Sequence, residues 1–182
     1  MLLTQLGLPF RVVPPDYDEQ PLPVAPSELV ETHALGKARS VERGPADGAI
    51  LGVDTAVVID GTVLGKPADA GHAREMLWRL AGREHVVCSG LALRHDDLEI
   101  AQHESTIVRF RACSSDEVDA YVRLGEWRGR AGGYAIQGKG AALAESVAGD
   151  YANVVGLPVA LLVRLLRHHF PADTIFSPAP GP

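Results

Sequence analysis

All three lysines of the chain directly follow a glycine, at Lys37, Lys66 and Lys139, whereas the other 14 of the 17 basic residues are arginine. The lysine ammonium is a compact charge that can reach a phosphate oxygen, and a glycine beside it lets the backbone approach a ligand closely. The pattern therefore favours a polyphosphate ligand. Chance use of the two basic residue types is the alternative.

Asp54 lies in an apolar, β-rich run that covers residues 50–58. A carboxylate among valine and isoleucine is costly to bury unless it is paired, binds a metal or faces a cleft at a strand end. Two interpretations follow. Asp54 is either half of a structural ion pair or a functional group, namely a general base or a metal ligand.

A compact acidic loop precedes this strand, with Asp16, Asp18 and Glu19 close together. Carboxylate oxygens of such a loop can hold Mg²⁺ or Mn²⁺. The alternative is a loop that is simply solvated by water.

Residues 133–140, Gly-Tyr-Ala-Ile-Gln-Gly-Lys-Gly, nearly match the phosphate-loop pattern G-x-x-x-x-G-K-[ST]. Gly140 stands where the pattern needs a hydroxyl for Mg²⁺, and the preceding segment does not have the composition of a buried strand. A true phosphate loop is therefore not expected, but the glycines indicate a tight turn or a close approach to a ligand.

The bulk composition, with 46% hydrophobic and 22% charged residues among 182, is that of an ordinary globular domain. We expect one domain over residues 1–170 and a disordered tail over 171–182, where four of twelve residues are proline. The net charge of −6 argues against a nucleic-acid partner. No apolar run is long enough to span a membrane, and the start lacks the features of a signal peptide. Cys88 and Cys113, without metal or redox spacing, suggest a reduced, cytoplasmic protein.

Several local patterns predict the elements that position these residues. An N-terminal helical turn, a short strand at 10–13 and a helix over 27–41 capped by Ser27 are expected first. Asp60-Gly61 between two β-branched runs predicts a two-residue hairpin that pairs Ile59 with Thr62 and places Thr55 opposite Lys66. Strict alternation then puts Asp54 and Lys66 on opposite faces.

The second half of the chain alternates helices and strands. Asp69 is expected to cap a helix that ends at Gly82, and strands are expected at 85–93 and 99–111. Ser114 and Glu117 form a capping box for a helix that Gly125 ends, and a last helix covers 158–168. The fold class is therefore α/β with a mixed sheet.

Six segments, in order along nearly the whole chain, carry a family resemblance. They are Asp18-Glu19, Gly36-Lys37-Ala38, Val53-Asp54-Thr55-Ala56-Val57-Val58, Leu64-Gly65-Lys66-Pro67, residues 131–138 (Ala-Gly-Gly-Tyr-Ala-Ile-Gln-Gly) and residues 149–158 (Gly-Asp-Tyr-Ala-Asn-Val-Val-Gly-Leu-Pro). Together they resemble the Maf family of nucleoside triphosphate pyrophosphatases. The resemblance implies a Maf-like, inosine-triphosphatase-like sheet with flanking helices and a central cleft between two lobes.

The resemblance also implies hydrolysis between the α and β phosphates of a nucleoside triphosphate, with a divalent cation, Mg²⁺ or Mn²⁺, as cofactor. On the matching positions Asp54 would accept the proton of the attacking water. Asp54 and Glu19 would hold the metal, Glu19 would also help to hold the substrate, and Lys37 and Lys66 would face the phosphates. Cleavage of a phosphoanhydride needs charge neutralisation and an aligned water more than a covalent nucleophile, and these residue types supply both.

Thr55 and Gln137 match family positions linked to base choice. Family members acting on dTTP and UTP carry threonine and glutamine there, and the sister group acting on 7-methyl-GTP carries glutamine and glutamate. By this comparison the chain resembles the dTTP/UTP type. A glutamine amide can donate and accept hydrogen bonds at a pyrimidine edge.

One departure concerns the N-terminus. The family opens with a Ser-x-Ser-Pro-Arg-Arg loop that leads into a Leu-Leu helix, whereas Met1-Leu2-Leu3 already matches that helix. We expect either an upstream start or loss of a phosphate-binding element. The second possibility motivates an alternative, a nucleotide-binding protein that does not hydrolyse its ligand and acts through partners in cell-division control. The sequence leaves open whether the chain forms a homodimer.

Overall fold

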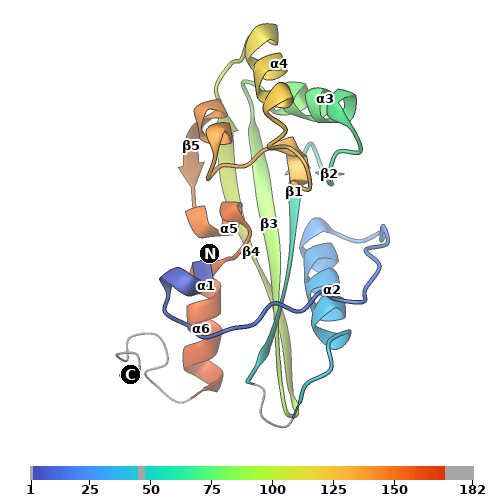
Figure 1. Ribbon diagram of the computed structural model, residues 1–182, viewed down its shortest axis with the longest axis vertical. Coiled ribbons are helices and arrows are strands. Elements are labelled where there is room, and N and C mark those ends of the chain that lie inside the picture. Colours follow the sequence, from blue (N-terminus) through green and yellow to red (C-terminus); the bar gives the residue numbers. More distant parts are fainter. Residues whose placement is uncertain (1, 45–47, 171–182) are drawn as a thin grey trace.

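A five-stranded sheet in the order β2-β1-β3-β4-β5 is the centre of the molecule (Figure 1). The coordinates are those of a computed structural model and describe residues 2–44 and 48–170. The strands are β1 (Ile50–Ile59), β2 (Thr62–Leu64), β3 (Glu84–His95), β4 (Leu98–Phe110) and β5 (Ala144–Ala148). The helices are α1 (Leu2–Gln5), α2 (Pro26–Arg39), α3 (Ala70–Leu80), α4 (Ser115–Leu124), α5 (Tyr151–Val155) and α6 (Val159–His169), with 3₁₀ turns η1 (Ala131–Gly133) and η2 (Lys139–Leu143).

The α/β class with flanking helices is confirmed. Each pair of neighbouring strands in the described sheet runs antiparallel. The parallel pairs that a mixed sheet would contain are therefore not found among these strands. Short connections explain two of the four pairs, because the turns between β1 and β2 and between β3 and β4 are hairpins, which join only antiparallel strands.

The hairpin between β1 and β2 has the predicted turn. Asp60 and Gly61 both have positive φ, 51° and 71°, and Ile59 pairs with Thr62. The pairing stops at Val57 with Leu64, however, so the predicted position of Thr55 opposite Lys66 is wrong. The short β2 leaves residues 50–56 of β1 at the edge of the described sheet, with β3 as their only neighbouring strand.

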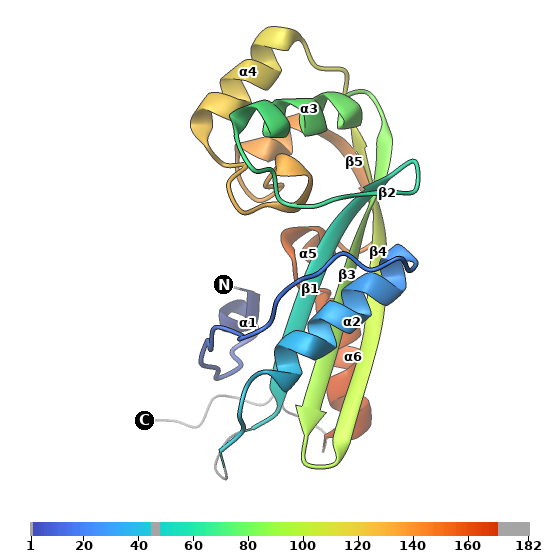
Figure 2. The same cartoon turned by 90° about the vertical axis from the view of Figure 1, so that its right-hand side faces the viewer.

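Helix α2 covers one face of the sheet at very short range (Figure 2). A β-carbon on Gly52 would lie 2.2 Å from the carbonyl oxygen of Ala34, and one on Gly90 would lie 2.1 Å from that of Val30. Gly90 is the cross-strand partner of Asp54, so the two residues share this face. The glycines thus bring α2 close enough for its side chains to reach Asp54.

The opposite face carries two separate apolar clusters. One joins β3 to α6, on the side of the sheet away from α2 (Figure 2), through Leu91, Leu93, Leu161, Leu162 and Leu165. The other lies where α3 and α4 cover the far end of the sheet, and it includes Val57, Val87, Leu77, Leu80, Phe110, Val118 and Tyr134. Along β1, Val53 packs against the first cluster and Val57 belongs to the second. Thr55 lies between them, at the predicted central cleft.

Most predicted helix ends are confirmed. Asp69 caps α3 through a 2.8 Å bond from the His72 amide, and Ser114 forms the capping box of α4, which ends at left-handed Gly125. The Ser27 cap is wrong, because α2 begins at Pro26 behind Ala25, which makes no side-chain cap. Proline is favoured at the first helical position because its missing N–H is not needed there.

The predicted strand at 10–13 is also wrong, because no strand of the sheet pairs with that segment. Both cysteines are free thiols. Within the described ranges no helix is long and apolar enough to cross a membrane. The expected tail, 171–182, lies outside the described residues, and the single-domain boundaries stay a prediction.

Candidate active site

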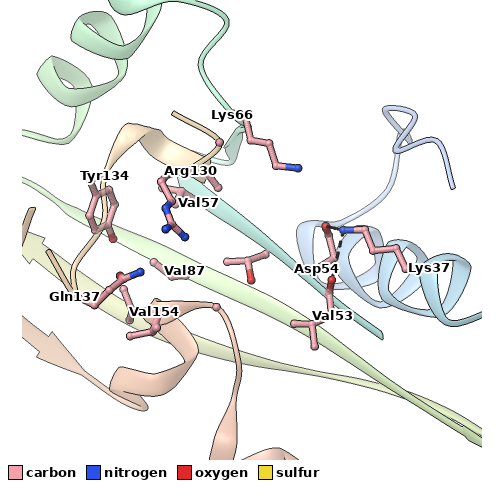
Figure 3. A pocket seen from close by; sticks show the side chains of 15 residues that line it. Lys37, Val53, Asp54, Val57, Lys66, Val87, Arg130, Tyr134, Gln137 and Val154 are labelled. Atoms are coloured by element: carbon pink, nitrogen blue, oxygen red, sulfur yellow. Dashed lines mark hydrogen bonds and ion pairs between the residues drawn. The ribbon is translucent and has the colours of Figure 1, made fainter. Parts of the chain in front are cut away.

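A cavity of about 280 Å³ opens at the gap between the two apolar clusters (Figure 3). Its wall comes from α2, β1, the loop after β2, the glycine-rich segment around η1, and α5 with its following turn. The polar side chains that line it belong to Lys37, Asp54, Thr55, Lys66, Arg130, Tyr134 and Gln137. The fold therefore brings five of the six predicted site residues to one cavity, and the sixth, Glu19, contacts its two lysines.

The sheet edge explains how Asp54 and Thr55 can share this cavity. Neighbouring residues of a strand point to opposite faces, so the two side chains diverge. Because β2 has ended at Leu64, no strand covers this stretch of β1 within the described sheet. The cavity therefore extends around the edge of β1 and reaches both faces.

Lys37 connects the charged groups on the α2 side. Its Nζ lies 2.6 Å from Asp54 Oδ1 and 2.7 Å from Glu19 Oε1, and it also reaches the carbonyl oxygen of Val53 at 3.4 Å. The side chains of Lys37 and Asp54 are only 16% and 12% exposed. An ion pair this far from bulk water is screened less than a surface pair, so each charge depends on the other.

An aromatic contact places Glu19 against Lys37. The ring of Tyr17 packs on Gly36, where a β-carbon would lie 2.2 Å from Cε2, and the Tyr17 hydroxyl is 2.9 Å from His33 Nδ1. Tyr17 is two residues before Glu19, and Gly36 is directly before Lys37. The glycine of this glycine-lysine pair therefore makes room for the acidic loop and fixes it on α2.

The ion pairs oppose the effect of burial on two pKa values. Burial tends to lower the pKa of Lys37, but hydrogen bonds and charge attraction from Asp54 and Glu19 raise it above its ordinary value. Burial tends to raise the pKa of Glu19, yet Lys37 and Lys66 lower it. Lys37 is therefore a full positive charge, and Glu19 a full negative charge, at neutral pH.

Lys66, in the loop after β2, approaches the same carboxylate as Lys37. Its Nζ lies 3.4 Å from Glu19 Oε2, and its side chain is 58% exposed. The preceding carbonyl, of Gly65, accepts a 3.1 Å hydrogen bond from the Gly132 amide. This bond ties the loop that carries Lys66 to the glycine-rich segment.

Thr55 and Gln137 are held differently. The Thr55 hydroxyl lies 2.8 Å from the hydroxyl of buried Ser89, which in turn donates toward the Asn153 carbonyl oxygen at 3.4 Å. The Gln137 amide makes no side-chain hydrogen bond within the described residues, and the residue is exposed. Thr55 is thus fixed in orientation, whereas the carbonyl oxygen and the NH₂ group of the Gln137 amide are both available to a ligand.

Tyr134 forms the apolar wall between Gln137 and the far cluster. Its hydroxyl lies 2.8 Å from Nε2 of His85, a buried residue of β3, and its ring stacks edge-on against His85 and Phe110. Burial lowers the pKa of His85 to about 4 and raises that of Tyr134. Both rings are therefore neutral at physiological pH.

The segment 149–158 supports the floor of the cavity. Asp150 caps α5 through a 2.8 Å bond from the Ala152 amide. Buried Asn153 donates from Nδ2 to the Val87 carbonyl of β3 and to Thr106 Oγ1 of β4, each at 3.0 Å. These bonds hold α5 against the sheet, so that Val154, Val155 and Gly156 line the cavity. The polar residues of segment 149–158 therefore act mainly by holding the cavity floor in place.

The near-match to a phosphate loop has a local explanation. The backbone amides of Lys139 and Gly140 donate to the two carboxylate oxygens of Glu126, at 3.2 and 3.3 Å. A β-carbon on Gly140 would lie 2.5 Å from the Ala135 carbonyl oxygen, so glycine is needed for packing. Because these two amides already donate to the Glu126 carboxylate, they do not form a phosphate-binding loop. Lys139 is exposed and does not line the cavity.

Arg130 also lines the cavity, although it was not among the residues predicted from the sequence. Its signal was a glycine before a basic residue, Gly129-Arg130, the same pattern as in the three glycine-lysine pairs. Gly82-Arg83 has this pattern too, but Arg83 pairs with Asp60 at 2.7 Å outside the cavity lining. The dipeptide alone therefore could not identify Arg130.

The carboxylates of Asp54 and Glu19 fit the divalent cation that the resemblance implies. Both contact Lys37 Nζ, so the separation of the two oxygens cannot exceed the sum of 2.6 and 2.7 Å. Mg²⁺ is typically held by one or two carboxylates together with phosphate oxygens and water. No cluster of three or more His, Cys, Asp or Glu suited to a metal exists among the described residues. A cation here would therefore take its other ligands from a bound anion and water.

Comparison with known proteins identifies the family of the chain. The Maf-like protein family model matches residues 1–169. The chain is 49% identical over 166 residues to the dTTP/UTP pyrophosphatase of Symbiobacterium thermophilum, covering 91% of this chain and 86% of that protein. It is 45% identical over 170 residues to that of Moorella thermoacetica, with 91% and 87% covered. It is 42% identical over 170 residues to the dTTP/UTP pyrophosphatase of Ruminiclostridium cellulolyticum, covering 91% of this chain and 88% of that protein. The chain belongs to the Maf family.

Proposed function

We propose that the protein is a nucleoside triphosphate pyrophosphatase that converts dTTP and UTP to the monophosphate and pyrophosphate. The observation that carries this proposal is the largely buried carboxylate of Asp54, held against Lys37 in a cavity that further cations line. Relatives of the chain, 42–49% identical to it, are named dTTP/UTP pyrophosphatases.

Asp54 is the base of the proposed reaction. Its carboxylate accepts a proton from water as the water oxygen bonds to the α-phosphorus. The bond from the α-phosphorus to the bridging oxygen breaks, and the electron pair leaves with pyrophosphate. Lys37 and Lys66 lie where phosphate oxygens would enter, and they neutralise charge that grows on the leaving group. Lys37 holds Asp54 in place until the substrate supplies another anionic partner.

A divalent cation, Mg²⁺ or Mn²⁺, is part of the proposal. Asp54 and Glu19 would hold it, and when bound it supplies positive charge to the phosphate oxygens and orients them. Glu19 is suited to this role because Lys37 and Lys66 keep it ionised.

Base choice is assigned to Thr55 and Gln137. The Thr55 hydroxyl is oriented by Ser89, and the free Gln137 amide can pair with a pyrimidine edge, which offers both donors and acceptors. A site with a fixed hydroxyl and a neutral amide discriminates by hydrogen bonds rather than by charge. We further infer a cytoplasmic protein without a nucleic-acid partner, and a homodimer is a further proposal.

The test is pyrophosphate release by the purified protein on dTTP, UTP, 7-methyl-GTP and ATP, each with Mg²⁺ and with Mn²⁺. We expect preferred turnover of dTTP and UTP, with no turnover in excess chelator. A folded protein that binds dTTP without releasing pyrophosphate would overturn the enzyme in favour of the alternative, a non-hydrolysing nucleotide binder. Preferred turnover of 7-methyl-GTP would overturn the roles of Thr55 and Gln137.

A further inference from the structure

Arg130 differs from the other cations of the cavity in having no hydrogen-bonded or ion-paired side-chain partner among the described residues. Lys37 pairs with two carboxylates and Lys66 with one. The Arg130 guanidinium makes no hydrogen bond or ion pair with any described residue, and it points into the cavity between Tyr134 and the Asp54–Lys37 pair (Figure 3). A cation aimed into a cavity without a counter-charge is available to an anionic ligand.

The backbone of Arg130 is nevertheless fixed. Its amide donates to the Trp127 carbonyl, and its own carbonyl accepts from the Gly133 amide, each at 3.1 Å. Two residues later, Gly132 donates to Gly65, the residue before Lys66. A β-carbon on Gly132, whose φ is 68°, would lie 2.9 Å from Val57. The segment is therefore locked to β1 and to the Lys66 loop, which sets where Arg130 and Lys66 lie relative to each other.

We propose that Arg130 is a substrate-binding residue that grips a phosphate of the nucleotide with its guanidinium. The planar fork of arginine matches two phosphate oxygens at once, whereas the lysines across the cavity act as point charges. Lys37 and Lys66 approach from the α2 and β2 sides, and Arg130 approaches from the glycine-rich side. A phosphate chain in the cavity would then be neutralised from three elements. This inference rests on the proposed function.

The competing role for Arg130 is to stack on the base, since a guanidinium also packs on aromatic rings. The two roles differ in what the side chain recognises. A phosphate contact changes binding of inorganic pyrophosphate and leaves binding of thymidine unchanged. A base contact does the reverse.

The experiment compares Arg130→Gln and Arg130→Lys with Arg128→Gln as the matched control. Arg128 is an arginine two residues away whose guanidinium lies over the Trp127 ring, 4.9 Å from its centroid, outside the cavity lining. Calorimetry with inorganic pyrophosphate and with thymidine, kcat and KM on dTTP, and the unfolding midpoint are measured for each protein.

We expect Arg130→Gln to lower kcat/KM on dTTP by about 10²-fold, as for loss of one preorganised donor to a charged transition state. Pyrophosphate affinity should fall about tenfold or more, with thymidine binding unchanged. Arg130→Lys should recover part of both losses because it keeps the charge without the fork. The unfolding midpoint should stay near the wild-type value, since the guanidinium makes no hydrogen bond or ion pair with a described residue.

Two results would overturn the inference. If Arg130→Gln and Arg128→Gln bound pyrophosphate equally well, a contact between Arg130 and a phosphate would be ruled out. If Arg130→Gln changed the binding of thymidine but not of pyrophosphate, Arg130 would contact the base instead. If the wild-type protein released no pyrophosphate from dTTP, the proposed function would fail by itself. Calorimetry with pyrophosphate would still test the contact between Arg130 and the anion, because it does not require turnover. If the wild-type protein did not bind pyrophosphate, the inference would be wrong.

Discussion

The two sides of the cavity hold their functional groups in different ways. On the side formed by α2, β1 and the loop after β2, called the α2 side here, Asp54, Lys37, Glu19 and Lys66 form a chain of ion pairs in which every charge has a partner. On the glycine-rich side, Arg130 and Gln137 have no side-chain partner among the described residues, and the backbone alone sets their position. One side is arranged by its own charges, and the other is left ready for charges and hydrogen bonds that a ligand brings.

The difference separates stability from activity. Removing one member of a half-buried ion pair leaves its partner uncompensated, which destabilises the fold as well as the site. Removing a guanidinium that makes no hydrogen bond or ion pair with a described residue should change mainly what it binds. Substitutions on the α2 side should therefore change both unfolding and turnover, and those at Arg130 should change turnover alone.

The strongest way to break the comparison is Asp54→Asn. The amide cannot accept the proton from water, and it leaves Lys37 with only Glu19 as a charged partner. We expect kcat for pyrophosphate release to fall about 10³-fold, within the range for loss of a general base. The unfolding free energy should also fall. Asp60→Asn is the control, because Asp60 lies at the exposed hairpin turn of the same strand, where asparagine also tolerates positive φ. Wild-type kcat in Asp54→Asn would exclude it as the base.

A pH titration tests whether the uncharged ring of His85, which contacts Tyr134 behind Gln137, stabilises the fold. The folded-state pKa of His85, about 4, lies below its ordinary value of 6.5. The stability that the neutral ring supplies is therefore fully present above pH 6.5 and is lost as the pH falls toward 4. The shift corresponds to a loss of up to about 3 kcal/mol of unfolding free energy.

Urea unfolding at pH 7, 6, 5 and 4 measures this loss. His85→Gln is the comparison, since its amide stays neutral and can still bond to the Tyr134 hydroxyl. We expect the fall in stability between pH 6.5 and 4 to be smaller in the variant by about the His85 contribution. If the unfolding free energy of the two proteins changed with pH in the same way, His85 would not be the source of the pH dependence.

A smaller effect is expected from Gly36→Ala, which perturbs the α2 side without touching its charges. The new methyl group would lie 2.2 Å from the Tyr17 ring, so the ring must move and take Glu19 away from Lys37. We expect about 1–3 kcal/mol of destabilisation from this overpacking and about a tenfold lower kcat/KM. Gly48→Ala is the control, because a β-carbon there meets no atom within 4 Å. Equal activity of the two variants would mean that Glu19 does not need the Tyr17 contact.

Local chemistry predicted much of this fold. The Asp60-Gly61 turn, the Asp69 cap and the Ser114 capping box each depend on residues a few positions apart, and each is confirmed. The errors concern partners that are distant in the sequence. The segment 10–13 has strand-like composition but pairs with no strand of the described sheet, and β2 ends at Leu64, before the chain passes to α3.

The site residues show the same limit. Asp54 could be singled out because a charge within an apolar strand is costly unless it has a role. That Lys37 pairs with it depends on Gly52 and Gly90, which let α2 approach the sheet, and no local pattern contains this information. Arg130 was missed for the same reason, since only its place beside the cavity distinguishes it from Arg83.

The early end of β2 at Leu64 determines which insertions and substitutions this part of the protein can tolerate. Access to both faces of β1 depends on how many residues β2 contains, and much less on which residues they are, since Thr62 and Val63 are exposed. A few residues inserted after Leu64 that continued the ladder would pair with 54–56 and seal the cavity while leaving every functional side chain in place. Insertions directly after Leu64 should therefore be tolerated far less than substitutions of Thr62 or Val63.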